Sequence, residues 1–266
     1  MIMWKKRIIV FVVFVCPIVC KCQNIRQDLI FGATTLCSQQ GITSIEKNIS
    51  GLPILGNSKW IVGIHQTYCI PELWNVSVSY ASKIKKRGSL PVTISCHGPG
   101  NFLNIRLKTG YSQAFSKHFS AGIRLLSEYY FINGSTNMFT VGFDAGALYA
   151  INNKASIGLV CSMPNLIHNT SESMWKNIQI ETAFSYYLFD KANINFGIRN
   201  SQYTNIEFIA SVSSVLTKHT FLFLAYSSGN NQISTGVTIA LKNINIAVLA
   251  EINFRIGVSP EIQIAF

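Results

Sequence analysis

The chain has 266 residues and a formal net charge of +11, and 48% of it is hydrophobic while only 12% is charged. A soluble domain carries about 25% charged residues, so this composition argues against a water-soluble globule and against a disordered chain. After the N-terminus, no apolar run reaches the roughly 20 residues that a membrane-spanning helix needs. A chain that is apolar on average but not in blocks is typical of a membrane β-barrel, where lipid-facing and lumen-facing residues alternate.

Residues 1–22 have the pattern of a secretory signal peptide. A basic stretch (residues 5–7) precedes an apolar stretch (residues 8–15) that is too short to anchor the chain as a helix. We therefore expect export and removal of residues 1–22. The alternatives are an uncleaved anchor and a lipoprotein acylated at Cys16, Cys20 or Cys22.

From Lys59 onward the sequence is a series of alternating segments separated by short turn signals. In one of them Ile180, Thr182 and Phe184 share a face opposite Glu181. The segments run to about 9–14 residues, which exceeds the usual five or six of globular strands and suits tilted strands that cross a membrane. The pattern predicts an all-β fold, an antiparallel transmembrane β-barrel of about fourteen strands. The expected strands are 59–68, 73–83, 90–97, 102–115, 118–131, 138–151, 154–163, 176–189, 191–200, 204–216, 219–228, 232–242, 244–254 and 256–266.

The last expected strand carries a more specific signal. Ile262, Ile264 and Phe266 share one face, and the sequence finishes on that phenylalanine. This arrangement resembles the signal by which outer-membrane barrels are handed to the barrel assembly machinery. We therefore expect an integral protein of the bacterial outer membrane, with that machinery as a partner.

Residues 23–58 do not alternate, so the predicted organisation is a signal peptide (1–22), a plug (23–58) and a barrel (59–266). A fourteen-stranded barrel is wide enough either to need filling or to hold an aqueous bore. The apolar side chains of the segment would meet water outside the barrel, so we expect a short helical and loop plug in the lumen. The alternative is a segment that hangs in the periplasm. Candidates to line the plug or a ligand pocket are Phe31, Leu36, Leu52 and Leu55, and the same residues could simply pack the plug against the wall.

The alternation also predicts a cluster of charges inside the barrel. A charge that faces lipid at the bilayer midplane would cost about 2–4 kcal/mol, so the lumen is the favourable site. Arg124 and Asp144 fall at similar depth on neighbouring strands, and we expect them to pair directly. The alternative is that these charges only line water. The predicted lumenal residues are Arg106, Lys108, Arg124, Glu128, Asp144 and Glu181.

One motif resembles a known family. The run Asn48-Ile49-Ser50-Gly51-Leu52 is similar to the Asn-Pro-Ala-Gly-Leu signature of FadL-like barrels, with Ile49 where the family has proline. These barrels include the PorV and PorQ proteins of the type IX secretion system of Bacteroidota. The resemblance covers most of residues 31–150. It implies a fourteen-stranded barrel with an N-terminal hatch that moves hydrophobic ligands or assists protein secretion, with secretion-apparatus components or secreted proteins as partners.

The sequence specifies no catalytic chemistry. The histidines are dispersed and no metal-ligand spacing or nucleophile motif is present, so we expect no enzyme activity, no cofactor and no metal. The basic run at residues 83–87 lacks interleaved aromatics, which argues against nucleic acid and favours outer-membrane lipid or lipopolysaccharide as its partner. A general diffusion porin and a purely structural barrel are the alternative functions. The porin needs an open bore, which an apolar plug would block.

Overall fold

The computed structural model describes residues 38, 42–54, 58–70, 72–84, 87–98, 102–134, 137–167, 178–188, 191–201, 204–229, 231–242 and 244–266. No helix in these ranges is long and apolar enough to cross a membrane.

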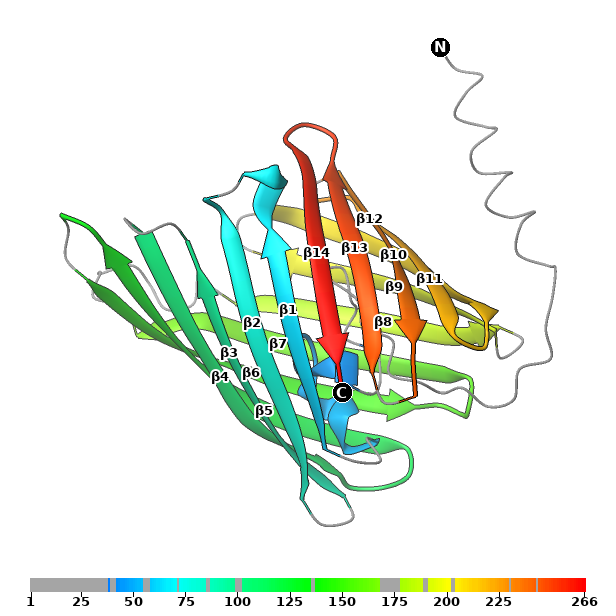
Figure 1. Ribbon diagram of the computed structural model, residues 1–266. Helices are drawn as coiled ribbons and strands as arrows, with labels where there is room; N and C mark the ends of the chain where they lie inside the picture. The colour runs from blue at the N-terminus through cyan, green and yellow to red at the C-terminus, as the bar shows by residue number, and fades with distance from the viewer. Residues whose placement is uncertain are drawn as a thin grey trace.

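Fourteen antiparallel strands form a closed barrel (Figure 1). Every strand pairs with its neighbours in the sequence, and β14 pairs with β1 to complete the wall. At that junction Trp60 and Phe266 exchange both backbone hydrogen bonds, at 2.9 and 3.1 Å. The strands are β1 (Lys59–Gln66), β2 (Trp74–Ile84), β3 (Gly88–His97), β4 (Phe102–Ala114), β5 (Phe119–Ile132), β6 (Met138–Ala150), β7 (Ala155–Ile167), β8 (Gln179–Leu188), β9 (Ala192–Ser201), β10 (Thr204–Thr217), β11 (Thr220–Ser227), β12 (Gln232–Ala240), β13 (Asn245–Asn253) and β14 (Gly257–Ala265).

The predicted fold and strand count are confirmed, and most strand ends differ by one or two residues. The largest differences flank the β7–β8 connection: β7 continues to Ile167, and β8 begins only at Gln179. Within β7, the register with β6 shifts between Val141 and Phe143, opposite the segment that contains Pro164. Proline cannot donate a ladder hydrogen bond and is tolerated at such bulges. The strand therefore continues past Pro164 to Ile167.

The two faces of the wall differ in chemistry. On β8, Ile180 and Phe184 point outward and are 46% and 38% exposed, whereas Glu181 and Ser185 point inward and are buried. The same alternation recurs around the barrel, and its outer face carries many exposed Ile, Leu, Val and Phe side chains. A continuous apolar outer face on a closed barrel fits contact with lipid.

The two rims of the barrel also differ. We call the rim at which β1 begins and β14 ends the terminal end, and the opposite rim the loop end. Connections at the terminal end have two to four residues, and those at the loop end have two to eleven. The β1–β2 connection at the loop end contains a short 3-10 helix, η3 (Thr67–Cys69). Bacterial membrane barrels show the same asymmetry, with short turns on the periplasmic side.

Residues 42–54, which we call the hatch, lie inside the barrel near the terminal end (Figure 1). They form two 3-10 helices, η1 (Ile42–Ile45) and η2 (Ile49–Ile54). Their contacts run to strands on several sides of the wall, including β2, β3, β4, β5 and β6.

Candidate functional site

The hatch has an apolar face that is fully buried. Ile45, Ile49 and Leu52 are at most 3% exposed and belong to one buried cluster with wall residues from β1, β2, β11, β13 and β14. Four of the seven wall residues in this cluster are alanines. The seven residues are Ile61, Ala81, Phe223, Ala225, Ala247, Leu249 and Ala265.

This packing bears on the candidate lining residues. Leu52 is 0% exposed and packs in that cluster, so it lines no open pocket in this structure. Phe31, Leu36 and Leu55 lie outside the described residues.

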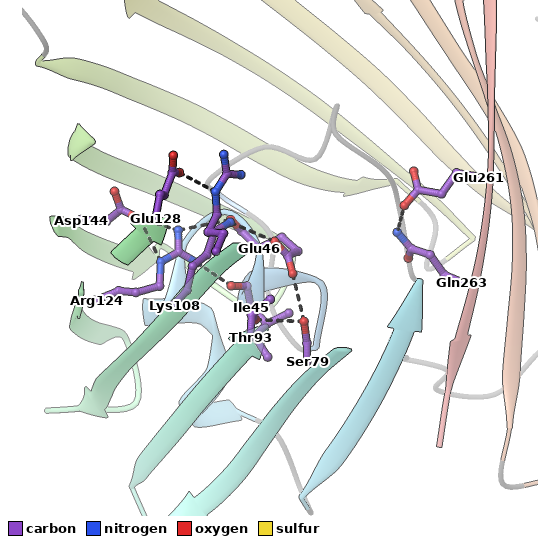
Figure 2. A network of polar contacts seen from close by, with 11 residues as sticks. Ile45, Glu46, Ser79, Thr93, Lys108, Arg124, Glu128, Asp144, Glu261 and Gln263 are labelled. Atoms are coloured by element: carbon purple, nitrogen blue, oxygen red, sulfur yellow. Dashed lines mark hydrogen bonds and ion pairs between the residues drawn. The ribbon is translucent and has the colours of Figure 1, made fainter. Parts of the chain in front are cut away.

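The opposite face of the hatch is polar, and Arg124 on β5 is its main contact. Its guanidinium donates through Nε and Nη2 to Oδ2 of Asp144 on β6, at 2.9 and 2.5 Å. The remaining donors reach the hatch, with Nη1 at 2.6 Å from the carbonyl of Ile45 and Nη2 at 3.3 Å from that of Glu46. Arg124 thus links Asp144, its predicted partner on the wall, to the backbone of the hatch, as Figure 2 shows.

Glu46 of the hatch makes a second polar link. Its carboxylate accepts from Lys108 Nζ at 3.2 Å and from Ser79 Oγ at 3.0 Å (Figure 2). Burial alone would raise the pKa of Glu46, but the charges of Lys108 and Arg124, with these hydrogen bonds, lower it from 4.5 to about 2. The carboxylate is therefore ionised at neutral pH.

This shift predicts an acid-induced release of the hatch. Because the pKa of Glu46 is lower in the docked state, its contribution to docking is complete above pH 4.5 and is lost as the pH falls toward about 2. Hydrogen exchange of the hatch amides, corrected for the intrinsic rate at each pH, should be slow between pH 5 and 8 and accelerate progressively below about pH 4. Glu46→Gln should flatten this dependence. An unchanged acid response in that variant would show that another group controls it.

Asn48 fixes the turn between the two hatch helices. Its Oδ1 accepts from the backbone N–H and Oγ of Ser50, at 3.2 and 2.6 Å, and its Nδ2 donates to the carbonyl of Ala147 on β6 at 3.1 Å. It sits directly over Gly146, where a Cβ would overlap Oδ1. The first residue of the motif singled out from the sequence therefore docks the hatch to the wall.

Serine hydroxyls of the wall complete the seat by donating to hatch carbonyls. Ser120 Oγ donates to the backbone carbonyl of Ser50 at 2.5 Å, and Ser89 Oγ donates to that of Leu52 at 3.3 Å. These bonds satisfy backbone groups that the short 3-10 helices leave without internal partners.

Further ion pairs line the lumen beyond the hatch. Arg106 lies 2.5 Å from Glu128, and Arg199 lies 2.7 Å from Glu181 and 3.5 Å from Glu207. All six of the predicted lumenal charges face inward and each lies in an ion pair. The prediction omitted Arg199 and Glu207, although alternation along 191–200 and 204–216 places both inward.

A cavity of about 210 Å³ lies between the hatch and this charged wall. Its lining is mostly charged or polar, with Leu126 and Val160 as apolar exceptions. Burial lowers the pKa of Lys47, which reaches this cavity from the hatch, from 10.5 to about 8. The other lining residues are Glu46, Arg124, Asp144, Ser162, Gln179, Glu181 and Arg199.

The lumenal face of β13, β14 and β1 carries acidic side chains. Glu261 accepts from Gln263 Nε2 at 2.5 Å (Figure 2), and its other oxygen lies 3.8 Å from His65 Nδ1. Glu251 on β13 is also buried in this region. The predicted assembly-signal residues Ile262, Ile264 and Phe266 alternate with these groups and are 50%, 37% and 53% exposed on the outer face.

The outer face of the barrel has an apolar hollow of about 490 Å³ over strands β7 to β11. Phe184, Phe196, Phe208 and Tyr226 line it, with Gly197 among the small residues between them. Since Glu181 and Arg199 face the lumen on the same two strands, β8 and β9, the hollow lies behind the charged cavity.

These features define the class of protein: a closed fourteen-stranded barrel with an apolar outer face and a lumenal hatch. No protein-family model matches the sequence, and no curated protein matches it.

Solved structures do share the fold. The CymD monoaromatic hydrocarbon channel superposes with a TM-score of 0.65 at 9% identity, over 85% of this chain and 92% of that one. A Pseudomonas aeruginosa FadL homologue gives 0.60 at 8% identity, over 88% and 94%. The Pseudomonas putida toluene transporter TodX gives 0.59 at 8% identity, over 86% and 93%. The chain therefore has the FadL-like barrel fold that the sequence motif suggested.

Proposed function

We propose that this protein is an outer-membrane transport barrel that passes small hydrophobic or amphipathic molecules, with the hatch as its gate. The observation that carries the proposal is the hatch itself, a short segment that lies inside the lumen and packs against the wall. The hatch is held by non-covalent contacts on two faces, and the wall around it is a complete ring of paired strands.

The chemistry of the two faces supports a hatch that can leave its seat. On the polar side it depends on a few charged and amide groups, chiefly Arg124, Lys108 and Asn48. On the apolar side, small residues such as Ala225, Ala247 and Ala265 form a wall with few deep interlocking side chains. Loss of the polar contacts would leave the hatch held by its three buried apolar side chains alone.

The choice of ligand class rests on two supports. Proteins of the same fold are described as a monoaromatic hydrocarbon channel and a toluene transporter. The apolar hollow behind Gly197 offers a place where an apolar molecule can lie beside the wall within the membrane. The charged cavity beside the hatch would suit the polar end of an amphipathic molecule.

Planar-bilayer conductance tests the gated barrel. The intact protein should be closed, and a chain lacking residues 24–58 should conduct in large, steady steps, because an empty barrel of this size holds an aqueous bore. Large steady conductance of the intact protein would instead establish a diffusion porin.

A second function, support of protein secretion or surface export as in PorV- and PorQ-like barrels, is favoured by one observation. The cavity of about 210 Å³ is smaller than the usual 300–1,000 Å³ of ligand pockets. A barrel that stays closed suits a scaffold better than a transporter. Copurification separates the two functions, since a bound lipid or hydrocarbon supports transport and a stoichiometric protein partner supports secretion.

A further inference from the structure

The terminal end of the barrel carries basic side chains on its turns. Lys83 and Arg87 lie on the two sides of the β2–β3 turn, and Lys117 lies in the β4–β5 turn. All three side chains are exposed. Lys59, the first residue of β1, lies at the same rim beside them.

The pattern continues around the rim. Each of the other four terminal-end turns carries one exposed lysine: Lys154, Lys191, Lys218 and Lys242. All six turns therefore contribute at least one base, and none of their described residues is acidic. The sequence of these turns contains one acid, Asp190, which lies outside the described residues.

The loop end lacks this excess of positive charge. In the described part of its connections, Arg255 is the one base and Glu72 the one acid. Among the described residues of the two rims, the excess of positive charge thus lies at the terminal end.

Aromatic side chains show how deep this rim lies in a bilayer. Trp60 and Tyr80 face outward on neighbouring strands near the terminal end, with ring centroids 4.4 Å apart. Tyr111, Tyr149 and Tyr186 occupy outward positions within a few residues of the terminal-end turns of β4, β6 and β8. Belts of Trp and Tyr mark the headgroup level in membrane barrels. The basic residues lie just beyond this belt, where the strands leave the hydrocarbon.

We propose that this basic ring binds the phosphate groups of anionic phospholipids in the leaflet around the terminal end. Lysine and arginine are effective phosphate ligands, and basic groups at a membrane surface attract anionic lipid. Every one of the six turns carries a base, and the β2–β3 turn is the most basic of them. A base on each turn fits a leaflet that surrounds the barrel, whereas a protein partner would need basic residues on one side only. Short turns place this rim on the periplasmic side, where the leaflet is phospholipid; lipopolysaccharide lies in the other leaflet.

Tryptophan quenching by brominated lipids tests the proposal. The reporter is the full-length barrel W4F/W74F/W175F, reconstituted in vesicles, in which Trp60 is the one tryptophan left. At equal mole fraction, brominated phosphatidylglycerol should quench Trp60 at least threefold more effectively than brominated phosphatidylcholine. Because the attraction is electrostatic, the preference should weaken in high salt. Equal quenching by the two lipids would overturn the proposal.

Three matched variants locate the effect. K59Q/K83Q/R87Q, on β1 and the β2–β3 turn beside Trp60, should reduce the preference to below 1.5-fold. K154Q/K191Q/K218Q removes the same number of charges across the barrel and should leave the preference intact. A second reporter, W4F/W60F/W175F, places Trp74 at the loop end and should show no preference. If Trp74 showed the same preference as Trp60, the net charge of the whole protein would explain the effect. That result would overturn the proposal of a specific basic ring. A shift in gel mobility on heating verifies that each variant has folded.

Discussion

Arg124→Met should convert a closed barrel into one that conducts. Arg124 is 5% exposed and binds both Asp144 and two carbonyl groups of the hatch, so its loss removes the central polar contact of the docked state. It also leaves Asp144, 6% exposed, without its partner. Removing one member of a buried ion pair costs about 3–5 kcal/mol. Because the undocked hatch would let water reach Asp144, much of that cost falls on docking.

Single-channel recording in planar bilayers measures this effect. A loss of about 3 kcal/mol changes an equilibrium by roughly 100-fold, since each 1.4 kcal/mol is a factor of ten. The open probability of Arg124→Met should rise by about that factor over the intact protein. A variant that stays closed would show that the apolar face alone retains the hatch.

Arg199→Met is the matched control. Arg199 forms ion pairs with Glu181 and Glu207, which all belong to the wall, and it makes no hydrogen bond to the hatch among those found in the described residues. The substitution therefore removes a lumenal arginine and two ion pairs while leaving the hydrogen bonds of the hatch in place. If Arg124 acts through its contacts with the hatch, the open probability of Arg199→Met should stay within about threefold of that of the intact protein. A larger rise would show that losing any positive charge from the lumen is enough.

The double variant R124M/D144L separates two effects of the same arginine. Replacing both members of a buried ion pair with apolar groups often changes stability little. In this variant, the cost of leaving the Asp144 carboxylate unpaired is therefore absent. The carbonyls of Ile45 and Glu46 still lack their donors. If the conductance of the double variant lies between that of the intact protein and that of R124M, both causes contribute. The part that remains in the double variant is due to the lost hydrogen bonds to the hatch, and the rest is due to the unpaired Asp144.

The barrel and its inward charges could be predicted because both depend on the two-residue alternation of side chains along a β-strand. A residue two positions along a strand returns to the same face, so Glu181 and Phe184 fall on opposite sides of the wall whatever the tertiary contacts are. Arg124 and Asp144 could be paired because they lie on consecutive strands joined by a short turn, which fixes their register. The lumenal cluster therefore follows from local pattern and topology.

The hatch contacts could not be predicted in this way. Residues 42–54 have no strand period, and their partners are far away in the sequence: Glu46 binds Lys108, and Ser50 binds Ser120. Nor could the sequence decide whether Leu52 lines a pocket or packs, because both need an apolar side chain. In contrast, the basic ring was accessible once the strands had been counted, since alternate turns of an up-and-down barrel share a rim. Only the basic run at residues 83–87 stands out in the sequence itself.

Gly146→Ala should unseat the hatch by a steric route that involves no charge. A Cβ at position 146 would overlap Oδ1 of Asn48, whose amide anchors the hatch turn to β6. Gly122, directly opposite in the β5–β6 register, has the same role toward Ile49, because a Cβ added at position 122 would lie only 2.8 Å from Cγ1 of Ile49. The two glycines together form a recess in the inner wall that receives two consecutive hatch residues.

Cleavage by trypsin after Lys47 measures the result, because a docked hatch shields that bond. Overpacking a well-filled site costs about 1–3 kcal/mol, which is roughly a five- to 150-fold change in the undocked fraction, and cleavage should accelerate by that factor. Ala145→Val adds bulk on the same strand but on its outward face, so it should leave the cleavage rate unchanged. Since Asn48→Gly relieves the overlap but also removes the anchoring amide, N48G/G146A should be cleaved at the rate of N48G alone. Equal protection of G146A and the intact protein would mean that the hatch turn can shift without leaving its seat.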